Sequence, residues 1–90
     1  MKSYDELRDM IQTSDDGREM KIVCRETKDS WIDTSYVVTA SEVDGRWWVD
    51  SPDSTERVDT QEQAIESMID MADLFFTAED TRRQDEEHQP

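Results

Sequence analysis

The sequence predicts a two-layer α+β domain, in which a three-stranded antiparallel sheet carries helices on one face in the order α-β-β-β-α. Apolar residues recur at helical spacing near both ends of the chain, and apolar and polar residues alternate between them. An Asp-Gly pair also separates two segments rich in β-prone residues. The chain has 90 residues, of which 33% are hydrophobic, so it suits one small domain with a compact core.

The first helix is expected over residues 4–12. Ser3 and Glu6 have the spacing of a capping box, which satisfies backbone N–H groups at the start of a helix. Tyr4, Leu7 and Ile11 then share one face.

The first strand is expected over residues 19–26, where polar and apolar side chains alternate. Met20, Ile22 and Cys24 point one way, while Lys21 and Arg25 point the other way together with Val23.

The other two strands flank Asp44-Gly45, which predicts a hairpin with a two-residue turn. In that register the opposed pairs are Val43 with Arg46, Glu42 with Trp47, Ala40 with Val49 and Val38 with Ser51. The expected core face carries Tyr36, Val38, Ala40, Trp47 and Val49. Trp48 is expected on the outer face.

The last helix is expected over residues 61–76, after a loop that starts at Pro52. Thr60 and Gln63 form a second capping box. Its apolar side holds Ile65, Met68, Ile69, Ala72, Phe75 and Phe76. Beyond it, Ala78 is the only apolar residue, so we assign residues 1–76 to one acidic domain and residues 77–90 to a disordered or frayed acidic tail.

The net charge of −14 comes from 24 acids against 10 bases. Residues 77–90 hold five of these acids and two of the bases, so the remaining residues carry a net charge of −11. Such a charge repels nucleic acid and anionic membranes. The expected partner is therefore a basic protein surface.

A row of carboxylates follows one side of the last helix, at intervals of four, four and three residues: Glu62, Glu66, Asp70 and Asp73. The helix offers no compensating base, because no Lys or Arg lies between Arg57 and Arg82. Like charges at this spacing destabilise a helix by a few tenths of a kcal/mol per pair, about 0.2–0.5. We therefore expect the row to bind a partner, with further acids at Asp5, Asp9, Asp50, Asp53, Glu56 and Asp59.

The sequence offers no catalytic or metal site. His88 is the only histidine and lies in the expected tail, while Cys24 lies in mid-strand on the expected core face. Zinc needs several Cys and His ligands, and the acidic loop over residues 50–59 lacks the glycine and spacing of a calcium loop. We expect no enzymatic activity and no cofactor. No signal segment and no apolar run of about 18 residues is present, so we expect a cytoplasmic protein, in the host cell if the source is viral.

Small size, strong acidity and the helix TQEQAIESMIDMAD make the chain resemble the DNA-mimicking inhibitors of phages and mobile elements, the anti-CRISPR and anti-restriction proteins. The resemblance implies that the acidic surface occupies the basic nucleic-acid-binding cleft of a CRISPR surveillance complex or a nuclease. Carboxylates four residues apart on a helix rise about 6 Å per step, against roughly 3.4 Å between phosphates along one DNA strand.

Two alternatives remain open. The segment from residue 45 to residue 73 is similar to part of HicB-like antitoxin domains, at Val49, Pro52, Asp53, Thr60, Ala64 and Ile65. It lacks the glycines usual before the helix, a helix precedes the strands and no DNA-binding region follows. The chain would then be an antitoxin or another small binding partner. The acidity together with only three lysines also suits a protein adapted to high salt.

Overall fold

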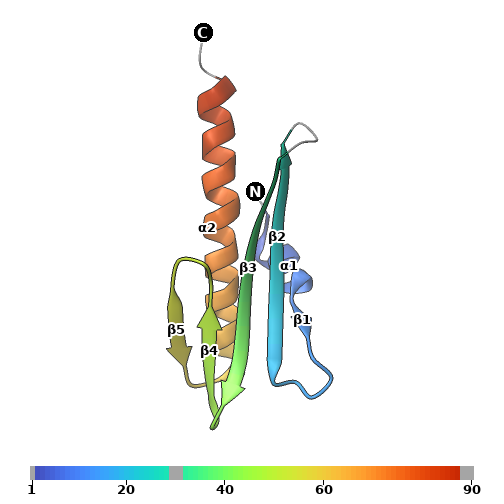
Figure 1. Cartoon of the computed structure of the whole chain (residues 1–90), viewed down its shortest axis with the longest axis vertical. Coiled ribbons are helices and arrows are strands. Elements are labelled where there is room, and N and C mark those ends of the chain that lie inside the picture. Colours follow the sequence, from blue (N-terminus) through green and yellow to red (C-terminus); the bar gives the residue numbers. More distant parts are fainter. Residues whose placement is uncertain (1, 29–31, 88–90) are drawn as a thin grey trace.

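The computed structural model describes residues 2–28 and 32–87, and the side chains of residues 2–25 and 35–77. In this part of the chain two helices flank a five-stranded antiparallel sheet, and Figure 1 shows both helices behind the sheet. The elements are α1 (Tyr4–Met10), β1 (Gln12–Thr13), β2 (Glu19–Lys28), β3 (Ile32–Val43), β4 (Arg46–Asp50), β5 (Thr55–Val58) and α2 (Gln61–Glu87). The strands lie in chain order across the sheet.

Both predicted N-caps are confirmed, and the reciprocal capping box is complete at α2. The Glu6 backbone N–H donates to Ser3 Oγ at 3.2 Å, and the Gln63 N–H donates to Thr60 Oγ1 at 3.1 Å. The side chain of Gln63 accepts from the Thr60 N–H at 3.2 Å, which completes the box at α2. Helix α1 ends two residues earlier than expected, because Ile11 is already extended (φ −71°, ψ 125°) and leads into β1.

The predicted hairpin is confirmed between β3 and β4. Asp44 and Gly45 both have positive φ, 54° and 80°, as a two-residue turn of the primed type requires. Three of the four expected pairs occur: Val43 with Arg46, Glu42 with Trp47 and Ala40 with Val49. The fourth lies beyond the end of β4, because the ladder stops where Thr39 pairs with Asp50.

The expected number of strands is wrong, since the described chain has five and not three. Strand β5 comes from the segment taken as a loop, and its Val58 pairs with Trp47 of β4. Strand β1 has two residues, which pair with Met20 and Lys21. Both strands are too short and too polar for alternation to reveal them, and they form because a neighbouring strand offers unpaired backbone groups.

The expected end of the last helix at Phe76 is also wrong, because the helical backbone of α2 continues to Glu87. Residues 77–87 are rich in Ala, Glu, Arg and Gln and contain neither Gly nor Pro, so nothing in their composition stops a helix. A loss of apolar residues ends the buried face of a helix and not the helix itself. The division into a domain over residues 1–76 and a tail over 77–90 stays a prediction.

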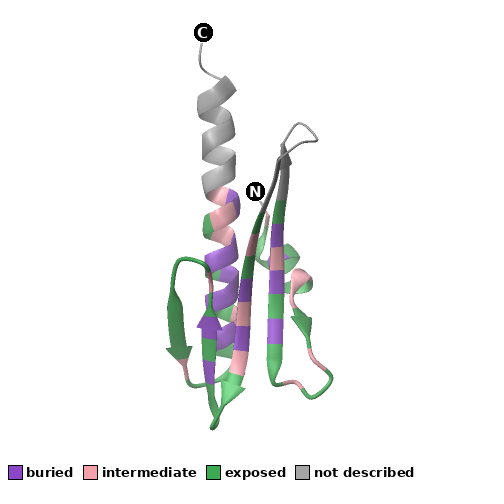
Figure 2. Ribbon diagram, in the orientation of Figure 1, coloured by how far each residue is buried: buried purple, intermediate pink, exposed green. Residues whose placement is uncertain are grey.

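The core lies between the sheet and the two helices, and Figure 2 shows its buried residues along facing sides of α2 and the strands. Trp47 is buried and Trp48 is exposed, as the alternation predicted. Near the far end of this core, Tyr36 stacks on Phe75 with ring centroids 5.4 Å apart. The buried residues are Leu7, Met20, Ile22, Cys24, Val38, Ala40, Trp47, Val49, Ala64, Met68, Ile69, Met71, Ala72 and Phe76.

Candidate partner-binding surface

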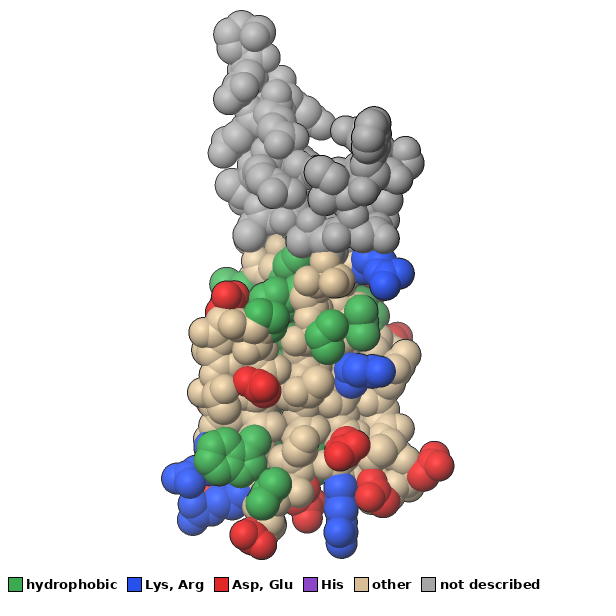
Figure 3. Space-filling view, in the orientation of Figure 1, with side chains coloured by type: hydrophobic (Ala, Val, Ile, Leu, Met, Phe, Trp, Pro, Cys, Tyr) green, Lys and Arg blue, Asp and Glu red, His purple; other side chains and the backbone are tan. Residues whose placement is uncertain are grey.

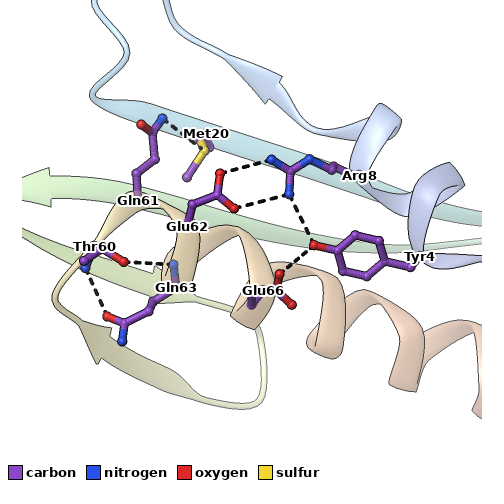
Figure 4. Close-up of polar contacts among 8 residues, drawn as sticks. All are labelled: Tyr4, Arg8, Met20, Thr60, Gln61, Glu62, Gln63 and Glu66. Atoms are coloured by element: carbon purple, nitrogen blue, oxygen red, sulfur yellow. Dashed lines mark hydrogen bonds and ion pairs between the residues drawn. The ribbon is translucent and has the colours of Figure 1, made fainter.

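The first two carboxylates of the α2 row bind α1. Arg8 Nη2 lies 3.1 Å from Glu62 Oε1, and Arg8 Nη1 lies 3.4 Å from the other oxygen of the same carboxylate (Figure 4). The Tyr4 hydroxyl donates to Glu66 Oε1 at 2.6 Å and accepts from Arg8 Nη1 at 3.2 Å. The expectation that the row has no compensating base is therefore wrong, because Arg8 supplies that charge from another helix.

This cluster shifts the pKa of its two α1 members. The hydrogen bond to the Glu66 carboxylate raises the pKa of the Tyr4 hydroxyl above its ordinary value, and Arg8 opposes part of this rise. Hydrogen bonds to Glu62 and then to Tyr4 raise the pKa of Arg8. At neutral pH Tyr4 is a neutral donor and Arg8 is a cation, as the observed bonds require.

Three more of the predicted acids accept hydrogen bonds from nearby hydroxyl groups. Asp50 accepts from Thr55 Oγ1 at 2.7 Å, Asp53 accepts from Tyr36 Oη at 3.3 Å, and Glu56 accepts from Ser67 Oγ at 2.8 Å. Ser67 is a buried residue of α2, so its bond to Glu56 ties β5 to the helix. These hydrogen bonds hold the three carboxylates in place, and all three residues are exposed to solvent.

A cleft of about 380 Å³ lies between β5 and the first turns of α2. Its charged lining consists of four acids and one base: Glu56, Asp59, Glu66, Asp70 and Arg57. The structure therefore brings together four of the ten predicted binding residues, two from β5 and the loop after it, and two from α2. We call this the acidic cleft.

The other six predicted residues lie outside the acidic cleft. Glu62 pairs with Arg8, and Asp50 and Asp53 lie at the end of β4 and in the loop after it. Asp5 and Asp9 are exposed on α1, and Asp73 is half-buried on α2. The row on α2 is thus divided: Glu62 binds α1, Glu66 both binds α1 and lines the cleft, and Asp70 lines the cleft.

The sheet presents a different surface on the side away from the helices, which we call the outer sheet face. Strand pairing places there four bases, Lys21, Arg25, Arg46 and Arg57, two acids, Glu19 and Asp50, and four apolar side chains, Val23, Val37, Val43 and Trp48. Figure 3 shows this side, where apolar, basic and acidic groups all lie among polar atoms. The Arg57 guanidinium lies over the Trp48 ring, 5.4 Å from its centroid.

We did not predict from the sequence that the outer sheet face would gather four basic side chains. Alternation already placed Lys21 and Arg25 together on one side of the first strand. Arg57 could not be added to them, because its strand was taken as a loop. The side of β4 that carries Trp48 also carries Arg46, which strict alternation along that strand could have indicated.

Cys24 is not placed as a reactive thiol. Cys24 is fully buried, and burial raises the pKa of its thiol to about 11, so the thiol stays protonated at neutral pH. His88 lies outside the described residues. Within the described ranges, no group of three or more His, Cys, Asp or Glu residues is placed to hold a metal ion. None of the helices described is long and apolar enough to cross a membrane.

Comparison with known proteins gave no match to this chain, whether with protein-family models, curated proteins or solved structures. The resemblances to DNA-mimicking inhibitors and to HicB-like antitoxins therefore stay predictions.

Proposed function

We propose that this protein is a non-enzymatic inhibitor whose acidic cleft and adjoining helix side imitate nucleic acid. In this proposal they occupy the basic nucleic-acid-binding cleft of a partner protein, such as a CRISPR surveillance complex or a nuclease. The observation that supports the proposal is the acidic cleft itself, where four carboxylates from two separate segments converge on one surface. A basic protein surface is the complementary partner for such a cluster.

The carboxylates of the cleft are held on rigid elements. Glu66 and Asp70 lie one turn apart on a capped helix, and Glu56 is held by its bond from Ser67. Side chains that are already ordered lose little conformational freedom when a partner binds, which favours affinity.

The acidity is also directional. Four of the seven basic side chains described lie on the outer sheet face, away from the helices. A basic partner is therefore attracted to the helix side and repelled from the opposite face. This asymmetry orients the protein on its target and raises the rate of productive encounter.

The test begins with a partner captured from a bacterial lysate on the immobilised protein and eluted with duplex DNA. The binding of a fluorescent duplex to that partner is then measured by anisotropy, with and without this protein. We expect the protein to displace the duplex competitively. A partner that keeps its full affinity for the duplex when saturated with this protein would contradict mimicry.

Two matched double variants locate the binding surface. Asp59→Asn with Asp70→Asn removes two charges from the acidic cleft, and Asp5→Asn with Asp9→Asn removes two charges from α1. We expect the cleft variant to weaken partner binding about tenfold or more, and the α1 variant to weaken it only slightly, because charges at an interface centre cost far more than charges at its rim. Equal losses would show that diffuse acidity, and not the cleft, carries the binding.

A further inference from the structure

Strand β2 has one side that its neighbours leave largely uncovered. It has ten residues, but β1 pairs only with Met20 and Lys21. In the described ranges 2–28 and 32–87, no strand pairs with β2 on this side beyond Lys21. Figure 1 shows β2 continuing well past the short β1.

Two hydrogen bonds establish which backbone groups face outward. The carbonyl of Arg18 accepts from the Glu42 N–H at 2.9 Å, toward β3, and the carbonyl of Glu19 accepts from the Ser14 N–H at 2.9 Å, toward β1. Successive residues of a strand point their backbone groups to opposite sides. The N–H and C=O groups of Val23, Arg25 and Thr27 therefore point away from β3, along an edge open to another strand.

The side chains beside this edge are unusual for so acidic a chain. On the outer sheet face Lys21 and Arg25 flank Val23, and the two basic residues are about 13 Å apart along the strand. The other edge of the sheet, β5, has only four residues and borders the acidic cleft. The β2 edge is thus longer than the β5 edge, and it is the more basic of these two.

We propose that the open edge of β2 binds an extended segment of a partner protein by β-strand addition. In this arrangement an apolar residue of the segment lies opposite Val23 and an acidic residue lies opposite Arg25. The backbone of the edge supplies hydrogen bonds, and the side chains of β2 select the sequence. This site is separate from the acidic cleft and has the opposite charge.

A second copy of the chain suits this edge poorly. Two β2 strands paired edge to edge would bring Lys21 and Arg25 of one copy beside the same residues of the other, and like charges across a strand pair are destabilising. Each copy also carries a net charge of −14. Charge complementarity therefore favours an acidic segment from a different protein.

The probe is the synthetic peptide TTETVT, acetylated and amidated, with its Glu opposite Arg25 and its Val opposite Val23 in antiparallel pairing. We expect it to shift the backbone amide signals of Val23 and Arg25 in NMR titrations. The peptide TTKTVT should bind about tenfold more weakly, because a lysine then faces Arg25. N-methylation of the Glu and Val of TTETVT should abolish binding, because their N–H groups point toward β2. N-methylation of the Thr residues at peptide positions 2 and 4 should not, because those N–H groups point away from β2.

Variants of the protein give the reciprocal test. Arg25→Glu should reverse the preference, so that TTKTVT binds more tightly than TTETVT. Val23→Pro removes an outward N–H without breaking the ladder to β3, and it should abolish binding, while Val23→Thr should retain it. The Asp59→Asn and Asp70→Asn variant should bind the peptide normally, which separates this site from the proposed inhibitory surface.

The proposal fails if TTETVT leaves the Val23 and Arg25 signals unchanged, or if both N-methylated peptides bind alike. Should Val23→Pro not fold, the two methylated peptides decide the question on the unaltered protein. Sedimentation that shows a dimer of the unaltered chain, lost in Arg25→Glu or Val23→Pro, would assign the edge to a second copy and overturn the proposal.

Discussion

The helix side and the outer sheet face of this domain differ sharply in charge. The helix side carries the acids of α1 and α2 and the acidic cleft, whereas the outer sheet face carries four bases, two acids (Glu19 and Asp50), valines and Trp48. A chain adapted only to high salt would benefit from acids on every face, since the whole surface meets the same solvent. The excess of bases over acids on the outer sheet face is not what adaptation to high salt alone predicts.

The two sides also differ in how their charged groups are held. On the helix side, Glu62, Glu66 and Glu56 accept hydrogen bonds from Arg8, Tyr4 and Ser67. On the outer sheet face, Arg57 lies over Trp48, and between described side chains none of its four bases forms an ion pair. The acids are therefore ordered before any partner arrives.

The largest predicted change in the free energy of unfolding comes from loosening α1, which belongs to the helix side. Leu7 is 1% exposed and is the buried residue of α1. Leu7→Ala should lower the free energy of unfolding by about 2–4 kcal/mol, because it removes buried methyl groups and leaves a cavity. A urea titration followed by circular dichroism measures this change.

Leu74 provides the matched control, since it is a leucine on a helix that is 70% exposed. Leu74→Ala should change the free energy of unfolding by no more than about 0.5 kcal/mol. Similar losses at the two positions would mean that α1 does not pack as described. The helix side would then lack the rigidity on which the proposed function relies.

A smaller effect is expected on the sheet side, at the turn between β3 and β4. Gly45 has φ +80°, and no atom lies close enough to obstruct an added Cβ. Gly45→Ala should therefore destabilise the protein through backbone strain alone, by about 1–2 kcal/mol. Asp44→Gly removes a side chain from a position that also has positive φ (54°), and it should be neutral or slightly stabilising in the same thermal melts. A stable Gly45→Ala variant would show that the turn has another geometry.

Much of the fold could be predicted from local signals. The capping boxes at Ser3 and Thr60 marked the starts of both helices, and Asp44-Gly45 established the register of the central hairpin. These signals involve residues close in sequence. Strands β1 and β5 depend instead on backbone groups of a neighbouring strand, so their own residues carry little of the information.

The candidate site could be predicted only in part, because it also depends on contacts between residues that are far apart in the sequence. The spacing of Glu66 and Asp70 showed that they share a side of the helix. The sequence could not show that Glu56 and Asp59 would join them, because this requires β5 to lie beside α2. Nor could it show that Glu62 would be paired, because Arg8 is distant in sequence.

The smallest effect is expected from the hydroxyl that links the two helices. Tyr4 is 42% exposed, so Tyr4→Phe should lower the Tm only slightly at pH 8, by less than Gly45→Ala does. The hydrogen bond to Glu66 raises the pKa of Tyr4 in the folded protein above its ordinary value of 10.0. Since the unfolded chain then loses this proton first, the bond contributes to stability below pH 10, and its contribution falls as the pH rises through the folded-state pKa.

The difference in Tm between the unaltered protein and Tyr4→Phe should therefore shrink between pH 8 and pH 11. Added salt should have little effect on this difference if the short bond at 2.6 Å dominates, because screening acts mainly on charges that are farther apart. Tyr36→Phe removes a hydroxyl on β3 that donates to Asp53, and it controls for general alkaline destabilisation. A Tm difference for Tyr4→Phe that is the same at both pH values would show that Tyr4 does not donate to Glu66. Glu66 would then be fully available to a basic partner, while Glu62 would still be paired with Arg8.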